Sequence, residues 1–361
     1  MLAFTHLKEL MTFQTYLNTL GGSSYLYANA SNAMKDLLVY IARRRNISSP
    51  NIILPAYLPA KLYRTALAAG YEVKFYEVYD RCTFDPKEIE RLMDDKTAAV
   101  FHVHYFGFPY CIDEMRTLTR ERNVFLIEDC ALSIGATHGG KWLGTYGDFA
   151  VFSMRKMFLY SEGGFLRLSE QFTDFRPEYE WRVRSCFSVQ KYLGQRAKYV
   201  YVRLTAGADP LHIVRPDPVG YMDWSTPKQV LHVKMLSAFT ERRLRFVDVE
   251  KVVKKRRENY NYVSERFPAG SALEPLHPRL PDGCTPYSFP FLVKDGSRDR
   301  LRQELFDNGT LPGAGWPESP FGDQYKRTKE LSQRLLELPI HQALTRQQID
   351  RSLRVVARWA R

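Results

Sequence analysis

The feature that most restricts the fold of this chain is the alternation of short apolar runs with amphipathic stretches between residues 51 and 168. This alternation is typical of an α/β fold, in which strands of a mostly parallel sheet alternate along the chain with helices. One helix is expected to begin near Asn32, after a turn rich in Ser and Asn. The pattern predicts strands at 51–57, 72–78, 97–107, 124–129, 148–154 and 163–169, and helices at 85–95 and 112–123.

The C-terminal part of the chain predicts a second, smaller unit. A chain of 361 residues and 42.0 kDa exceeds the usual size of one hydrophobic core, so two packed lobes are expected. After a helix around residues 236–266, the order is strand, helix, Pro/Gly-rich loop and helix. We expect a large α/β lobe over residues 1–235 and a small α+β lobe over 236–361. Residues 169–235 are less regular, apart from some helix near 190–205.

The positive charge of the chain does not by itself indicate nucleic-acid binding. The formal net charge is +12, and much of it lies in residues 241–257. Valines interrupt these charges at roughly helical spacing, which is typical of a surface helix with one buried stripe and a solvated basic face. We therefore expect an enzyme with no nucleic-acid partner.

The cysteines and the start of the chain indicate a reducing, aqueous setting. The five cysteines are scattered without a CxxC pair or a Cys/His cluster, so neither a disulfide framework nor a zinc site is expected. The first residues lack the order of a signal peptide, and no apolar run approaches the roughly 20 residues needed to cross a bilayer. The expectation is a cytoplasmic protein with no membrane partner and no metal.

Two polar residues at neighbouring strand ends are the first candidates for catalysis. In an open parallel sheet the active site lies beyond the carboxyl ends of the strands. Asp129 ends the strand at 124–129, and Lys156 follows the strand at 148–154. A lysine amine condenses with an aldehyde, and a carboxylate keeps a ring nitrogen protonated, so the pair suits pyridoxal 5'-phosphate. Taken singly, such an Asp is more often a turn residue and such a Lys is usually solvated.

A phosphate-binding turn is predicted where the helix near Asn32 begins. A phosphate needs backbone N–H groups at a helix start together with one or two hydroxyls. Ser31 and Asn32 lie at that start, and Ser153 lies at the strand end before Lys156. Glycines at 163–164 would let the backbone approach a ligand closely. An ordinary N-cap and a plain β-turn would give the same two patterns.

These motifs together resemble the DegT/StrS family of sugar aminotransferases, a branch of the fold type I pyridoxal-phosphate enzymes. The resemblance implies an aspartate aminotransferase-like fold and a homodimer. It also implies that Lys156 carries the cofactor, that Asp129 lies beside the ring nitrogen, and that Ser31 and Ser153 contact the phosphate. The segments that carry it are NASNAM, NIILPAYLPA, VHYFGFP, IEDCALSIGATHGGKWLGTYGDFAVFS, the lysine six residues before EGG, and LELPIHQALTRQQID.

The activity that this resemblance implies is transamination. An amino acid such as glutamate or glutamine would be the donor, and the acceptor would be a nucleotide-linked keto-sugar or a cyclitol. The lysine, once released from the cofactor, would transfer a proton between the α-carbon of the donor and C4′ of the cofactor. Arginines between Arg176 and Arg203 are candidates to bind a diphosphate. An ordinary role as solvent-exposed surface charges is the alternative interpretation. His104 and Tyr160 are candidate substrate-binding side chains, and for His104 a histidine satisfied inside the core is as good an interpretation.

Several positions depart from the commoner family pattern. Leu132 stands where the family usually has Gln or His near the ring hydroxyl, and leucine offers no hydrogen bond. Pro59 replaces the aromatic residue that stacks on the ring, which leaves Tyr57 as the candidate substitute. The serine and the lysine of the motif are separated by two residues, where many members have four.

The departures keep other functions open. One is a non-transaminating enzyme that uses the same cofactor on the same scaffold, and another is a regulatory or binding protein with a relic site. A pyridoxamine-dependent dehydratase is disfavoured, because such dehydratases replace the lysine with histidine. A nicotinamide oxidoreductase ranks low, because no GxGxxG motif follows a predicted strand.

Overall fold

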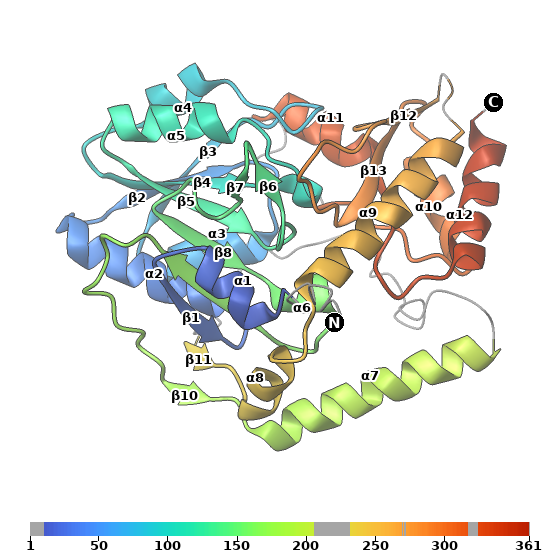
Figure 1. Cartoon of the computed structure of the whole chain (residues 1–361). Helices are drawn as coiled ribbons and strands as arrows, with labels where there is room; N and C mark the ends of the chain where they lie inside the picture. The colour runs from blue at the N-terminus through green and yellow to red at the C-terminus, as the bar shows by residue number, and fades with distance from the viewer. Residues whose placement is uncertain (1–10, 206–231, 269, 271, 317–323, 361) are drawn as a thin grey trace, which may run out of the picture.

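The computed structural model describes residues 11–205, 232–268, 270, 272–316 and 324–360. Two main sheets organise these residues, one of nine strands and one of three (Figure 1). Strands of the large sheet alternate along the chain with helices that cover it, which confirms the α/β class expected from the sequence.

The large sheet has the strand order β10-β11-β1-β9-β8-β5-β4-β2-β3. The run from β8 to β3 is parallel throughout, while β9 and β1 are antiparallel to their neighbours. Parallel strands covered on both faces are near-continuous apolar runs, which is why the sequence shows them clearly. The strands are β1 (Ser23–Tyr27), β2 (Asn51–Pro55), β3 (Glu72–Tyr76), β4 (Thr97–Val103), β5 (Phe125–Cys130), β8 (Phe149–Phe152), β9 (Gly164–Leu168), β10 (Trp181–Arg182) and β11 (Lys234–Met235).

Helices cover this sheet, with α4 and α5 on one side and α2 and α3 on the other (Figure 1). The longest of these, α2, begins because Asn29 caps it: the Asn29 side chain accepts the Asn32 N–H at 3.1 Å. It ends at Asn46, which adopts the left-handed conformation common after helices. The described helices up to residue 205 are α1 (Phe13–Thr19), α2 (Ala30–Arg45), α3 (Ala60–Ala68), α4 (Pro86–Leu92), α5 (Ile112–Glu121), α6 (Met154–Phe158) and α7 (Ser185–Thr205). A short hairpin, β6 (Thr137–His138) with β7 (Lys141–Trp142), separates β5 from β8.

The three-stranded sheet is antiparallel and has the order β12-β13-β14. Its apolar residues belong to the same buried cluster as those of the large sheet: Ile53 of β2, Phe101 of β4 and Phe289 of β13 are all members. The two sheets therefore share a continuous core rather than being joined by a free linker. The C-terminal elements are α8 (Ala238–Leu244), α9 (Val249–Arg266), β12 (Leu273–Pro275), β13 (Ser288–Val293), α10 (Arg298–Asp307), α11 (Lys326–Arg334), β14 (Leu335–Pro339) and α12 (Arg346–Trp359).

Two expected elements differ in the structure. The helix expected around 236–266 is divided into α8 and α9, because Asp248 starts a new helix by accepting the Lys251 N–H at 2.9 Å. The strand expected at 97–107 ends at Val103, and a 3₁₀ turn, η1 (Tyr105–Gly107), follows it. In that turn Phe106 has a φ of 55°, which a continuing strand would not allow.

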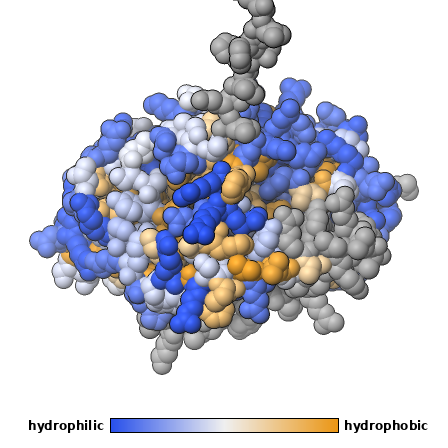
Figure 2. Space-filling model, turned by 60° about the horizontal axis from the view of Figure 1, so that its bottom comes forward, coloured by the Kyte–Doolittle hydropathy of each residue, from blue (hydrophilic) through white to orange (hydrophobic). Residues whose placement is uncertain are grey.

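The irregular segment after β9 contributes β10 and the long helix α7, which runs along the lower side of the molecule in Figure 1. Residues 206–231 lie outside the described part of the chain. Figure 2 turns this lower side forward and shows apolar side chains among hydrophilic ones. The large apolar side chains that are exposed among the described residues lie in or beside β10, α7 and α8: Trp181, Phe187, Leu193 and Phe246. Among the helices described, none combines the length and the hydrophobicity that crossing a membrane requires.

Candidate active site

Asp129 and Lys156 meet at the carboxyl ends of two neighbouring parallel strands. Asp129 is near the end of β5 and pairs with Val151 of β8, and Lys156 lies in α6, which begins directly after β8. The two side chains are close enough that each charge shifts the pKa of the other. The arrangement expected from the sequence, an acid and an amine at adjacent strand ends, is therefore present in the structure.

Burial acts on both of these groups in the direction that favours their neutral forms. It raises the pKa of Asp129 and lowers the pKa of Lys156, while the opposite charge of the partner works against each shift. The Ala131 N–H, at 2.8 Å from Asp129 Oδ1, also stabilises the ionised carboxylate. Lys156 consequently holds more neutral, nucleophilic amine at neutral pH than an exposed lysine would.

A cavity of about 360 Å³ opens beside Lys156, at the junction of the large sheet with the C-terminal elements. That volume is within the range of small-molecule and cofactor sites. Its wall combines apolar groups with a few charged ones. The lining residues that matter for chemistry are Leu132, Lys156, Arg256, Tyr287, Trp316, Glu337 and His341.

Arg256 is a functional candidate that the sequence interpretation placed wrongly, on a solvated basic face. The side chain is 1% exposed and lines the cavity. Its guanidinium donates to the Gln342 side chain at 3.0 Å and to the Tyr287 carbonyl at 2.9 Å, with longer contacts to the Lys156 and Met157 carbonyls at 3.5 and 3.4 Å. Arg256 thus ties helix α9 to the segment that carries the lysine.

Replacing Arg256 with methionine is expected to destabilise the protein by about 3 kcal/mol, because several charge-assisted hydrogen bonds to buried carbonyls are lost together. Urea denaturation followed by circular dichroism measures this change. Lys254, exposed on the same helix, is the matched control, and Lys254→Met should change stability by less than about 0.5 kcal/mol. Equal effects of the two substitutions would show that the Arg256 bonds carry no stability.

Glu337 is the other charged group that sequence reasoning missed. It lies in β14, is 7% exposed, and accepts hydrogen bonds from the Ser288 hydroxyl and from the Gly315 N–H, the latter at 3.2 Å. Burial raises the pKa of Glu337, and the Lys156 charge partly opposes that shift. The cavity therefore has a carboxylate on the wall formed by the small sheet as well as Asp129 at the large sheet.

The predicted phosphate-binding residues lie at two helix starts that pack on the same glycine turn. Ser31, 8% exposed, is in the first turn of α2, and Ser153, 5% exposed, precedes α6. The Gly163 N–H donates to the Ala28 carbonyl at 2.7 Å just before α2, and the Gly163 carbonyl accepts from the Arg155 N–H at 3.3 Å in α6. Within the described chain, no hydrogen bond occupies either serine hydroxyl.

Asn32 and the glycine turn have structural partners. The Asn32 side chain donates to the His232 carbonyl at 2.5 Å and accepts from the Asn29 side chain at 2.9 Å. A Cβ on Gly164 would lie 2.4 Å from the Ala30 nitrogen. The absence of a side chain at Gly164 therefore lets the backbone of Ala30 pack against it. The close approach expected for a ligand is thus made by the start of α2.

The structure places three of the expected site residues away from the lysine cavity. Tyr57 is 1% exposed, packs against Tyr105 and Trp316, and accepts the Trp316 N–H at 3.4 Å. Tyr160 lines a different hollow of about 880 Å³, which is bordered by the first turns of α9. His104 is fully buried.

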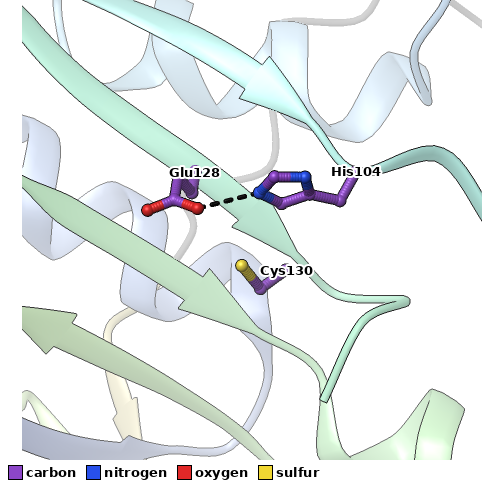
Figure 3. A group of neighbouring side chains, drawn as sticks. All are labelled: His104, Glu128 and Cys130. Atoms are coloured by element: carbon purple, nitrogen blue, oxygen red, sulfur yellow. Dashed lines mark hydrogen bonds and ion pairs between the residues drawn. The ribbon is translucent and has the colours of Figure 1, made fainter. Parts of the chain in front are cut away.

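His104 belongs to a buried group with Glu128 and Cys130 (Figure 3). Its Nε2 lies 2.8 Å from Glu128 Oε2, and Glu128 also accepts the N–H groups of Gly144 at 2.8 Å and Gly147 at 2.5 Å. The carboxylate oxygens are thereby committed to fixing the loop before β8. His104 is not among the residues that line the lysine cavity, and it is buried in the core, where Nε2 is paired and Nδ1 has no partner among the described residues.

The arginines after β9 were expected to be possible diphosphate ligands. Arg176 donates to the carbonyls of Thr173 and Phe175, and Arg182 pairs with Glu241 at 2.9 Å. The side chain of Arg203 is outside the described part of the structure. None of the arginines between Arg176 and Arg203 that the structure describes lines the lysine cavity.

Comparison with known proteins finds a family match over part of the chain and a match of fold over nearly all of it. Residues 9–174 match the DegT/DnrJ/EryC1/StrS aminotransferase family. GDP-perosamine synthase of Escherichia coli O157:H7 is 39% identical over 79 residues, 21% of this chain and 22% of that protein. GDP-perosamine synthase of Vibrio cholerae is 33% identical over 116 residues, 31% and 32% of the two chains. The aligned parts thus span between about a fifth and a third of these relatives.

Solved structures match nearly the whole chain at low identity. The aminotransferase PseC of Helicobacter pylori, involved in the biosynthesis of pseudoaminic acid, has a TM-score of 0.70 at 16% identity and covers 99% of this chain and 92% of its own. DesV of S. venezuelae, solved with a ketimine intermediate, has a TM-score of 0.67 at 18% identity over 96% and 87%. These likenesses confirm the aspartate aminotransferase-like fold. The chain therefore carries, over residues 9–174, a domain of the DegT/DnrJ/EryC1/StrS aminotransferase family.

Proposed function

We propose that this protein is a pyridoxal-phosphate-dependent aminotransferase that moves an amino group from an amino acid to a keto-sugar. The observation that carries the proposal is the placement of Lys156 in the wall of the cavity, electrostatically coupled to Asp129 at the adjacent strand end. Glutamate or glutamine is the proposed donor. A nucleotide-linked sugar or a cyclitol is the proposed acceptor.

The residues present fit the cofactor. Lys156 offers an amine of lowered pKa for the aldehyde, and Asp129 offers a carboxylate beside it for the ring nitrogen. Ser31 and Ser153 offer hydroxyls that no other described group occupies, at two helix starts where an anion is favoured. Leu132 offers only an apolar contact in the cavity wall.

The chemistry divides between the cofactor and the chain. Bound pyridoxal phosphate supplies an aldehyde that exchanges amines and a ring that accepts electrons from the α-carbon of the substrate. Asp129 keeps the ring nitrogen protonated, because an adjacent carboxylate favours the cationic form. Lys156 Nζ would hold the cofactor and, once free, would take up the proton from the donor α-carbon. Arg256 holds the lysine segment in place during these steps.

The acceptor class is inferred from relatives. Two curated relatives are GDP-perosamine synthases, and L-glutamine:2-deoxy-scyllo-inosose aminotransferase of Micromonospora echinospora is 35% identical over 82 residues, 22% of this chain and 20% of that protein. These names support a nucleotide-linked sugar and a cyclitol, respectively. A homodimer in the cytoplasm completes the proposal, and light scattering on the purified protein tests the dimer.

A non-transaminating use of the same cofactor is the second candidate, and Leu132 favours it. This side chain lines the cavity, and leucine offers no hydrogen bond where the resemblance implies a Gln or His near the ring hydroxyl. Loss of that contact would alter how the ring is held. The two candidates differ in what happens when an amino acid is added.

The half-reaction with glutamate tests the proposed activity. Protein loaded with pyridoxal phosphate should release one equivalent of 2-oxoglutarate per site without any acceptor, and the visible band of the bound cofactor should disappear. The same test with glutamine identifies a glutamine-specific enzyme. Retention of the band with every common amino donor would contradict transamination and favour the second candidate.

Replacing Glu337 with glutamine is expected to shift the pH dependence of cofactor attachment toward lower pH. The Glu337 charge raises the pKa of Lys156, so its removal lowers that pKa and exposes neutral amine at lower pH. Attachment rates measured from neutral to alkaline pH report the shift. Glu330, exposed on α11, is the matched control, and Glu330→Gln should leave the profile in place. A shift toward higher pH would contradict this account of the cavity.

A further inference from the structure

A second cavity lies at the opposite end of the central strands from Lys156. Its volume is about 580 Å³, and it is lined by Gly147, which precedes β8, and by Ser169, which follows β9. Since Lys156 follows the carboxyl end of β8, the length of that strand separates the two cavities. Nothing in the proposed aminotransferase reaction uses this region.

Positive charge dominates the wall of this second cavity. Its cations are Arg116, Arg120, Lys141 and Arg167, and Glu170 is the acid among the lining residues. Arg116 is neutralised by Asp148, with contacts of 3.0 and 3.3 Å to the two carboxylate oxygens. The other cations therefore leave an excess of positive charge, which attracts an anion from solution.

Arg167 is the residue that makes this a built site. It is 6% exposed, yet in the described chain it forms no ion pair with a carboxylate. Its guanidinium donates only to the carbonyls of Gly21 at 3.3 Å and Gly147 at 3.4 Å. Burial lowers the pKa of Arg167, and the charges of Glu128, Glu170 and Asp148 oppose that shift without forming an ion pair with it.

Two further groups at this cavity lack partners. The Ser169 hydroxyl is buried with no hydrogen-bond partner among the described residues, and so is the Nε of Arg116. These two groups are donors that a bound anion would satisfy. The Gly147 N–H, by contrast, is held by Glu128 at 2.5 Å, so the rim of the cavity is fixed before any ligand arrives.

We propose that this second cavity binds a phosphate ester that carries a flat ring, such as a nucleotide. Arg167, Arg120 and Lys141 surround the phosphate groups, because guanidinium and ammonium groups donate several hydrogen bonds to phosphate oxygens. Trp142 and Tyr146, both half-buried in the wall, provide the apolar surface for the ring. The site is independent of pyridoxal phosphate.

Calorimetric titration of the full chain with inorganic pyrophosphate, uridine diphosphate and uridine tests this proposal. Pyrophosphate should bind, and added salt should weaken it because screening reduces the attraction. Uridine diphosphate should bind at least about tenfold more tightly than pyrophosphate, because one stacked ring is worth a factor of this size. Trp142→Leu should remove that difference, and uridine alone should bind negligibly.

The variant Arg120→Gln/Lys141→Gln locates the site. Both side chains are exposed, so folding should be retained, and the dissociation constants for pyrophosphate and uridine diphosphate should rise about tenfold or more. The control is Arg155→Gln, an exposed cation next to Lys156, which should change neither constant. A loss of affinity in the control as large as in the double variant would show that any exposed cation attracts the anion, and would overturn the proposal. The proposal would also be overturned if neither probe bound saturably, or if the double substitution left binding unchanged. Equal affinity for pyrophosphate and uridine diphosphate would overturn the ring contact.

Discussion

Lys156→Ala is expected to abolish attachment of pyridoxal phosphate and to lower transamination by about 10⁴-fold or more. The substitution removes the amine that binds the aldehyde and also the group that moves the proton, and general acid–base catalysis alone contributes up to about 10⁴-fold. The visible band of the loaded protein and the rate of 2-oxoglutarate release measure the two losses. A loaded variant with most of its activity would contradict the assignment of Lys156.

Arg155→Ala is the matched control for that loss. Arg155 is the preceding residue in α6 and is exposed, whereas Lys156 faces the cavity. Its charge lowers the pKa of Lys156, so the control variant should raise that pKa and slow attachment slightly at neutral pH. It should still acquire the full band. Complete loss of the band in both variants would indicate that α6 had been damaged.

Asp129→Asn is expected to lower kcat by on the order of 10² to 10³ while leaving the cofactor attached. Loss of one preorganised charge partner in an enzyme site typically costs that much. Asparagine keeps the size of the side chain and the oxygen that accepts the Ala131 N–H. Steady-state kinetics and the absorbance of the bound cofactor separate the effect on catalysis from the effect on binding. An unchanged kcat would contradict the role of Asp129 at the ring nitrogen.

A measurement of stability tells a structural role of Asp129 from a functional one. Burial raises the pKa of Asp129 above its unfolded value, so its contribution to stability is lost as pH rises through the folded pKa. At neutral pH the ionised group therefore destabilises the cofactor-free protein. Asp129→Asn should leave the urea midpoint unchanged or raise it, and Asp95→Asn, an exposed control, should change neither stability nor kcat. A lower midpoint for Asp129→Asn would indicate a structural role.

The sequence predicted the strands β2, β3, β4, β5, β8 and β9 of the large sheet because their signals are local, and it missed β1, β10 and β11. Strands such as β4 and β5 are apolar runs, and their order along the chain places Asp129 and Lys156 at adjacent carboxyl ends. The small sheet was harder to predict. Both α11 and β14 were missed, because they follow a Pro/Gly-rich segment that was interpreted as one loop up to the last helix. The place of β14 is set by its pairing with β13.

The remaining site residues depend on packing between distant segments. Arg256 was interpreted as solvated because its neighbours are basic, yet it falls on the buried stripe of α9 with Val249, Tyr260 and Val263. That periodicity was the available signal. For Tyr57 no local signal existed, since its burial comes from contacts with Tyr105 and Trp316.

Peptide mass spectrometry after borohydride reduction tests the central claim most directly. Protein incubated with pyridoxal phosphate, reduced and digested should carry one phosphopyridoxyl group, on the peptide that contains Lys156. An unlabelled protein, or a label on another lysine with Lys156 unmodified, would contradict the account.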